Sequence, residues 1–335
     1  MEYALLGSIV THSVTNGFGI IANMLLVYLA LFKTPKQLTL YAPLILNVAV
    51  CDLFACLAAI FVQQRIIPDG LGLYYFSHGP CRVSGPLTCF IGYSLMLHCY
   101  AHSLWSLLFS FSYRYYVLCY LHPRKCIIKA IIVVIYIPSF IQFVSFCFAS
   151  DNESKVRAVI VRNFGYDVTS ECVSGHLNIL HAETLYTILH MTIPIVPIYT
   201  AILILRKLTM LKLHCQGNMS EKTRHLHSQL LKALTVQACL PILFLFAVTT
   251  YGIGQLKIYN HPLLEYSTFI LIGLIPMLSP LTSIYFVSPY RVWIFNKLRE
   301  PWTRCRMNSS PPQTFLQEQL LQEGGIDANN NIINA

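Results

Sequence analysis

The sequence predicts an all-α membrane protein, built as a seven-transmembrane helix bundle with its N-terminus outside and its C-terminus in the cytoplasm. Three observations predict it: the composition, the spacing of charge-free stretches, and the alternation of charge between loops. Only 11% of the 335 residues are charged and 55% are hydrophobic, whereas soluble chains are about 25% charged. So few charges cannot cover a water-exposed surface. The composition therefore excludes an ordinary soluble enzyme, a disordered chain and a nucleic-acid binder.

Seven stretches are long enough to cross a bilayer, because a helix needs about 20 residues to span the hydrocarbon core. The charge-free stretches that define them are interrupted only by Asp52. We expect spans at about residues 9–32, 41–62, 87–117, 130–150, 184–205, 233–256 and 266–288. Together with their loops they form a receptor domain over residues 1–300, followed by a disordered cytoplasmic tail over residues 301–335.

Prolines lie inside four of the spans, and neighbouring helices can satisfy the backbone carbonyls that they free. We expect these prolines to kink the helices without ending them. They are Pro138, Pro194, Pro197, Pro241, Pro276 and Pro280.

The loops alternate between basic and slightly acidic. Lysines and arginines gather in the loops after the first, third, fifth and seventh spans, which the positive-inside rule places in the cytoplasm. A sequon at Asn152 falls in an outside loop and is a predicted glycosylation site.

After the last span, residues Pro289 to Glu300 are predicted to form a short amphipathic helix on the inner leaflet. Cys305 beyond it is either a palmitoylation site or a reduced thiol.

Asp52 is costly inside a membrane and is therefore a candidate functional residue. It lies in Leu46-Asn47-Val48-Ala49-Val50-Cys51-Asp52-Leu53, which resembles the second-helix signature of rhodopsin-like receptors; Gly19 to Val27 is similar to the first-helix signature. We expect Asn23 to donate to Asp52 across the helices. By the resemblance, Ser103 and Ser279 join this cluster, which either holds a sodium ion or is a structural network with water.

The cytoplasmic end of the third span reads Phe111-Ser112-Tyr113-Arg114-Tyr115-Tyr116. It looks like the D-R-Y region with which rhodopsin-like receptors meet the G protein, and this resemblance implies a coupling role for Arg114 and Tyr115. Tyr113 replaces the acid of the pattern, so Arg114 lacks the neighbouring carboxylate that usually pairs with this arginine in the inactive state. The alternative for Arg114 is snorkelling to lipid head groups.

Cysteines on the outer side suggest a disulfide. Cys89 lies 25 residues before Arg114, about 37 Å along a helix, which places it at the outer rim. Cys172 is the single cysteine in the outside loop over residues 151–183. A Cys89–Cys172 bond is the first choice, and Cys81 is the alternative partner.

Longer strings resemble one family. They include Val62-Gln63-Gln64-Arg65-Ile66-Ile67-Pro68, Gly92-Tyr93-Ser94-Leu95-Met96-Leu97-His98, and the closing Ser288-Pro289-Tyr290-Arg291. These look like nematode serpentine receptor class delta chemoreceptors over residues 15–300. The resemblance implies a chemosensory G-protein-coupled receptor, in the plasma or ciliary membrane of a sensory neuron, that couples an external small-molecule cue to a heterotrimeric G protein.

We expect a ligand pocket in the outer half of the bundle, aromatic-rich with a few polar groups and suited to a small, largely apolar molecule. Plain helix packing is the alternative role for each residue. The candidates are Met96, Leu97, Tyr100, His190, Leu243, Tyr251, Phe269 and Glu265.

No cofactor or metal is expected. His98 and His102 have the spacing of a metal pair, but no acid accompanies them, which favours a buried, hydrogen-bonded pair. The alternatives to a signalling receptor are a secondary transporter and a non-signalling partner subunit. Nothing in the sequence indicates an enzyme or specifies an oligomeric state.

Overall fold

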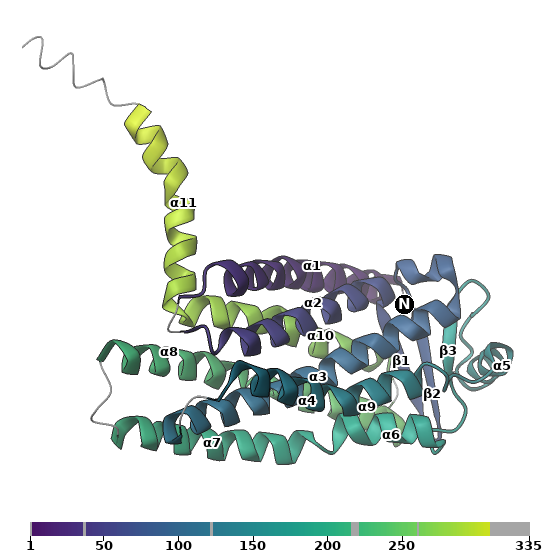
Figure 1. Ribbon diagram of the computed structural model, residues 1–335. Coiled ribbons are helices and arrows are strands. Elements are labelled where there is room, and N and C mark those ends of the chain that lie inside the picture. Colours follow the sequence, from purple (N-terminus) through teal and green to yellow (C-terminus); the bar gives the residue numbers. More distant parts are fainter. Residues whose placement is uncertain (1, 36–37, 121–122, 216–220, 260, 309–335) are drawn as a thin grey trace, which may run out of the picture. The chain divides into compact units, whose positions relative to one another are not determined.

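The computed structural model describes residues 2–35, 38–120, 123–215, 221–259 and 261–308. The chain divides into two units, Met1–Tyr290 and Arg291–Ala335. The first unit contains a bundle of long helices that run side by side, with a small sheet across one end (Figure 1).

The helices of the bundle correspond to the seven expected spans. The first four spans are α1 (Glu2–Phe32), α2 (Ala42–Val62), α3 (Pro86–Cys119) and α4 (Lys125–Phe146). The fifth is divided into α6 (Ala182–Thr192) and α7 (Ile195–Cys215), the sixth into α8 (Glu221–Gln237) and α9 (Pro241–Gln255), and the seventh is α10 (Pro262–Phe286).

Six of these spans are long and apolar enough to cross a membrane by length and hydropathy, counting α6–α7 and α8–α9 as one each, among the residues that the structure describes. The seventh is α3, which has 34 residues but also carries serines, histidines and tyrosines that lower its hydropathy. The seven-transmembrane bundle is therefore complete once α3 is included.

The prediction that prolines kink without ending helices is right for two spans and wrong for two. Pro138 lies inside α4, and Pro276 and Pro280 lie inside α10. Pro194 lies between α6 and α7, and Pro241 begins α9 after a turn. Since Pro241 has no N–H, the carbonyl of Gln237 accepts instead from the N–H of Leu240 at 3.1 Å. The helix tightens there into a turn of i+3 bonds.

The expectation of a purely α-helical protein is incomplete, because a three-stranded antiparallel sheet lies at one end of the bundle (Figure 1). The strands β1 (Gln64–Asp69) and β2 (Gly72–Ser77) form a hairpin, and β3 (Cys172–His176) pairs with β2. The hairpin turns at Gly70, whose φ of +61° suits glycine. A short 3₁₀ helix, η2 (Pro80–Ser84), leads from β2 to α3.

The sheet is buried on both faces, because its side chains alternate between two apolar clusters. Ile66 and Tyr75 face the core of the bundle. Their neighbours Ile67 and Tyr74 face the opposite way, toward the helix α5 (Glu153–Phe164). The sheet is thus a middle layer between α5 and the bundle.

The second unit contains helix α11 (Ser288–Asn308), most of which lies beyond Tyr290. The expected amphipathic helix is present but longer than residues 289–300, so the first residues of the expected tail, 301–308, are helical rather than disordered. The side chain of Cys305 and all of residues 309–335 lie outside the described part of the structure.

Candidate ligand-binding and coupling sites

An outer cavity lies beneath the sheet, and its empty space, including the part that is open to solvent, is about 600 Å³. The sheet closes it with Ile66, Leu73 and Tyr75, and the helices supply the other walls. The lining is mostly aliphatic and aromatic; its polar groups are hydroxyls. The helix residues are Tyr93, Leu97, Phe146, Thr187, Ile188, Met191, Thr192, Phe244, Ala247, Val248, Tyr251, Thr268, Phe269 and Ile272.

Three of the eight predicted pocket residues, Leu97, Tyr251 and Phe269, line this cavity. Tyr100 lines a second, deeper cavity. Met96 is packed in the apolar core, and Leu243 is half-buried on α9. The structure places these last three residues outside the outer cavity.

His190 and Glu265 also lie outside the outer cavity, because each is held by a polar neighbour. The Nδ1 atom of His190 lies 2.5 Å from Oε1 of Gln142, between α6 and α4. Glu265 is buried at the start of α10, where it pairs with Arg65 of β1. Neither side chain offers a hydrogen-bonding group to a ligand in the apolar cavity.

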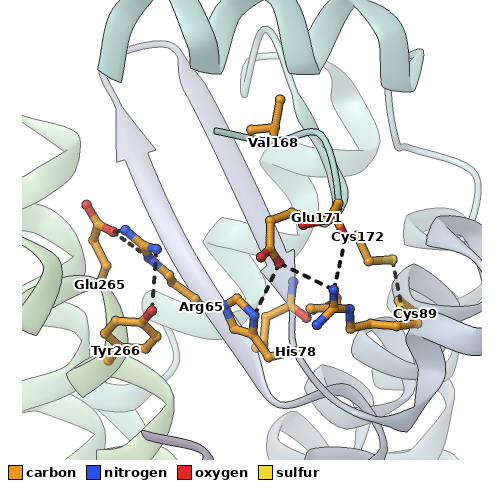
Figure 2. Close-up of polar contacts among 12 residues, drawn as sticks. Arg65, His78, Cys89, Val168, Glu171, Cys172, Glu265 and Tyr266 are labelled. Carbon is orange, nitrogen blue, oxygen red and sulfur yellow. Dashed lines mark hydrogen bonds and ion pairs between the residues drawn. The ribbon is translucent and has the colours of Figure 1, made fainter. Parts of the chain in front are cut away.

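The Arg65–Glu265 pair joins the hairpin to the seventh span (Figure 2). The Nη2 and Nε atoms of Arg65 lie 2.5 and 2.7 Å from Oε2 of Glu265, and the hydroxyl of Tyr166 donates to Oε1 at 3.2 Å. The guanidinium also lies 4.9 Å from the ring centres of Tyr166 and Tyr266. Charge-assisted contacts and aromatic faces therefore both stabilise this buried ion pair.

Other contacts join the hairpin to the outer end of the sixth span. The N–H of Gly70 donates to the carbonyl of Gln255 at 3.1 Å, and Nε2 of Gln255 donates to the carbonyl of Gly72 at 3.0 Å. The Nζ atom of Lys257 lies 2.6 Å from a carboxylate oxygen of Asp69. The sheet is therefore bonded to both helices that wall the outer cavity on that side.

The outer cysteines meet in one cluster, and the first-choice pairing is wrong in this structure. The disulfide joins Cys81 to Cys89, and the sulfur of Cys172 lies 3.4 Å from that of Cys89. Figure 2 shows Cys172 directed at Cys89 from β3. The short spacing of Cys81 and Cys89, with η2 folding the chain back between them, brings their Cα atoms to 5.1 Å, within the usual range for a disulfide. Burial raises the pKa of the Cys172 thiol.

Two histidines at the outer end, His78 and His176, have a lowered pKa, chiefly because they are buried. Burial lowers the pKa of His176 to about 4, although its hydrogen bond to the carbonyl of Ala149 acts in the opposite direction. Burial and the positive charges of Arg65 and Arg82 lower the pKa of His78 to about 4. Glu171 lies 3.4 Å from Nδ1 of His78 (Figure 2).

Asn152 is exposed at the N-terminus of α5, where its Oδ1 accepts from the N–H of Ser154 at 3.0 Å. That bond leaves the amide nitrogen, which is the atom that a glycan would modify, outside the cap. Glycosylation of Asn152 stays a prediction.

The empty space of the second, inner cavity, including the part that is open to solvent, is about 1100 Å³, and most of the predicted polar cluster lines this cavity. Asp52, Ser103 and Ser279 all line it, and the hydroxyl of Ser103 donates to Asp52 at 2.8 Å. Three oxygen-bearing side chains thus face one space, so the sodium site stays a prediction.

The expected bond from Asn23 to Asp52 is wrong. The Nδ2 atom of Asn23 donates to the carbonyls of Gly19 and Pro276, each at 2.9 Å. The carbonyl of Pro276 is available because its usual partner, the N–H four residues later, is absent at Pro280. Asn23 therefore donates to a backbone carbonyl that Pro280 leaves without its usual partner in α10.

Arg114 lies at the opposite end of the inner cavity from Asp52 and is only 6% exposed. Its guanidinium carbon lies 5.3 Å from the ring centre of Tyr41, which also packs edge-on against Tyr113 at 5.4 Å. Tyr41 is not among the residues predicted from the sequence, although a tyrosine at the inner end of the second span is evident there. Tyr115, the next residue after Arg114 on α3, is half-buried, and its coupling role stays a prediction.

His98 and His102 form the expected buried pair. Nε2 of His102 lies 3.1 Å from Oδ1 of Asn47 and 3.2 Å from the hydroxyl of Ser106. The described residues contain no group of three or more side chains suited to hold a metal ion.

Comparison with known proteins gives one family and one fold. The family described as serpentine type 7TM GPCR chemoreceptor Srd matches residues 8–296. Serpentine receptor class delta-18 of Caenorhabditis elegans is 39% identical over 279 residues, which cover 82% of this chain and 83% of the relative. Class delta-19 of the same organism is 37% identical, covering 85% and 86%, and class delta-3 is 36% identical, covering 89% and 90%.

Among solved structures, squid rhodopsin superposes with a TM-score of 0.64 over 89% of this chain and 85% of the rhodopsin chain. Sequence identity there is 12%, so this likeness shows the fold alone.

Proposed function

Because the chain belongs to the Srd family of serpentine seven-transmembrane chemoreceptors, we propose that it binds an external small molecule in the outer cavity and activates a heterotrimeric G protein. The resemblance found in the sequence is confirmed. The protein is an integral membrane protein and a sensory seven-transmembrane receptor in class, and both its family and its fold are those of receptors rather than enzymes.

The observation that carries the proposal is the apolar outer cavity between the sheet and the helices. Its walls hold hydroxyl groups but no charged side chain among the described residues. The nearest buried charges, Arg65 and Glu265, neutralise each other. The cavity therefore favours a small, uncharged and largely apolar cue.

The orientation of the bundle in the membrane is part of this proposal. The sheet, the Cys81–Cys89 disulfide and the Asn152 sequon belong to the same end of the first unit. Disulfides persist in oxidising compartments, which supports an extracellular position for that end. Arg114 and the basic loops then face the cytoplasm, where a G protein binds, in the plasma or ciliary membrane of a sensory neuron.

The experiment is expression of the full chain in cells that carry a calcium or cyclic-nucleotide reporter, screened with volatile and water-soluble cues. Phe269→Ala, which removes a ring from the cavity wall, should lower the potency of an active cue by roughly tenfold or more. Ile242→Ala is the matched control, because Ile242 is exposed on α9 and lines neither cavity. Equal potencies for the two variants at equal surface expression would place the cue elsewhere.

A further inference from the structure

The inner cavity ends at a buried arginine whose hydrogen-bonding groups are not all used. Arg114 lines the cavity and is 6% exposed, and its Nε and Nη1 atoms have no hydrogen-bond partner among the described residues. Buried charged donors without acceptors are costly, and this cost creates a driving force to bind an acceptor.

The acceptor that fits is an anion that approaches the edge of the guanidinium. The face of the group is already used, since it lies 5.3 Å from the ring centre of Tyr41. Its N–H groups project in the plane of the guanidinium, away from that contact. No carboxylate forms an ion pair with Arg114 in the described part of the chain, and Tyr113 stands where an acid was expected.

The rest of the cavity is suited to a hydrocarbon chain. Its walls between the two polar ends are largely aliphatic, with Leu44, Ile45, Leu104, Leu107 and Leu234 among them. Along α3 the arginine lies 11 residues beyond Ser103, the partner of Asp52, which is about 16 Å at about 1.5 Å per residue. Because Coulomb energy falls with distance, Asp52 repels a head group bound to Arg114 less than Arg114, in direct contact, attracts it.

We propose that the inner cavity is a binding site for a single-chain amphiphile with a carboxylate head, of the fatty-acid class. The carboxylate accepts hydrogen bonds from Arg114, and the chain lies along the leucine-lined wall toward Asp52. This site needs neither an external cue nor a G protein, so it goes beyond the proposed function.

The test measures binding of radiolabelled decanoate to the purified full chain in nanodiscs of neutral lipid. Saturable binding of one molecule per receptor is expected. Arg114→Gln should weaken it by roughly tenfold or more, since a charge-assisted hydrogen bond is lost. Leu104→Trp, which keeps the arginine and fills the cavity, should also weaken it. Arg124→Gln, which removes an exposed positive charge near the same end of the bundle, should leave binding unchanged.

Competing ligands test which chemical groups the site recognises and whether the bound molecule is a fatty acid or a membrane phospholipid. Unlabelled decanoate should displace the label, whereas decanol, which lacks the charge, and acetate, which lacks the chain, should not. Displacement by phosphatidylserine as effective as that by decanoate would assign the site to a membrane phospholipid and overturn the single-chain proposal. Binding that is equal in the wild type and Arg114→Gln, with both variants eluting as folded monodisperse receptor, would overturn the site itself.

Discussion

At the scale of the residue, the ring of Tyr41 attracts the guanidinium of Arg114, as a neighbouring carboxylate would do more strongly. An aromatic face attracts a guanidinium by about 0.5–2 kcal/mol when the pair is desolvated, and Tyr41 is buried. Tyr113, which replaces the acid, packs against the same ring and fixes its orientation. The arrangement holds Arg114 at the cavity wall without a carboxylate.

Tyr41→Leu should therefore raise cue-independent signalling, because it removes the aromatic contact that favours this arrangement. The expected increase is roughly two- to thirtyfold, which corresponds to about 0.5–2 kcal/mol. Tyr41→Phe, which keeps the ring face, should stay close to the wild type. The measurement is reporter output without cue, normalised to surface expression. A rise in the phenylalanine variant as large as that in the leucine variant would contradict a role for the ring face.

The buried imidazole of His176 makes the stability of the outer end depend on pH. Its Nδ1–H donates to the carbonyl of Ala149 at 2.9 Å, while Nε2 is buried near aromatic rings and has no hydrogen-bond partner among the described residues. Its pKa of about 4 is below the unfolded value of 6.5, so the unfolded chain binds the proton first as pH falls. The contribution of His176 to the free energy of unfolding should be at its full value above about pH 6.5. It should fall between pH 6.5 and 4, by up to about 1.4 kcal/mol per pH unit.

Thermal unfolding at pH 7.5 and 5.0 checks this expectation. His176→Asn, whose amide can still donate to Ala149 but does not titrate, should reduce the difference in melting temperature between the two pH values. His181→Asn is the control, because His181 lies five residues after His176 and is exposed. An unchanged difference in the His176 variant would show that other groups cause the acid sensitivity.

At the scale of the element, the hairpin is anchored to the seventh span by one enclosed ion pair. Removing either partner leaves the other charge buried, which costs about 3–5 kcal/mol. Arg65→Met and Glu265→Leu should each lower the melting temperature of the purified receptor by several degrees. The double variant Arg65→Met/Glu265→Leu should recover most of the loss, because no buried charge remains. Additive losses in the double variant would contradict the coupling of the two side chains.

The sheet was the element that sequence patterns did not reveal. Gln64 to Ser77 has the aromatic and β-branched residues of a hairpin around Asp69-Gly70, but Pro68 lies inside the first strand and weakens that pattern. The third strand comes from a loop about a hundred residues later, and such a pairing leaves no local periodicity. The spans, in contrast, were predictable because hydrocarbon excludes charge over a length that the bilayer sets.

The residue ranges of the helices were predicted better than the side chains that each helix directs into the outer cavity. Leu97, Tyr251 and Phe269 line the outer cavity as expected, whereas Met96, one residue before Leu97 on α3, does not. One residue rotates a helical side chain by about 100°. Rotation depends on neighbouring helices, which the sequence of one helix does not specify. Glu265 was misassigned for a related reason, since its partner Arg65 belongs to the unpredicted sheet.

At the scale of the whole molecule, the two cavities meet at the break in the sixth span. Phe244 lines both cavities and lies one turn after Pro241, which lines the inner one. Just before the break, Nε2 of Gln237 donates to the carbonyl of Ser279 and the hydroxyl of Ser283, each at 3.0 Å, so that α8 is bonded to α10. A change at the outer cavity can therefore reach the inner one by a swing of α9 relative to α8 about the turn at residues 238–240.

Pro241→Ala tests that coupling. Alanine supplies the N–H at position 241 that would bond to the carbonyl of Gln237 in a regular α-helix, so α8 and α9 should join into a continuous helix and lose the hinge. Cue binding should change little, because Pro241 does not line the outer cavity, while the maximal signalling response should fall by roughly tenfold, equivalent to about 1.4 kcal/mol of coupling free energy. Measuring cue affinity and maximal response on the same cells separates the two effects. A parallel loss of affinity and response would instead indicate a collapsed outer cavity, and an unchanged response would show that the two cavities communicate through other helices.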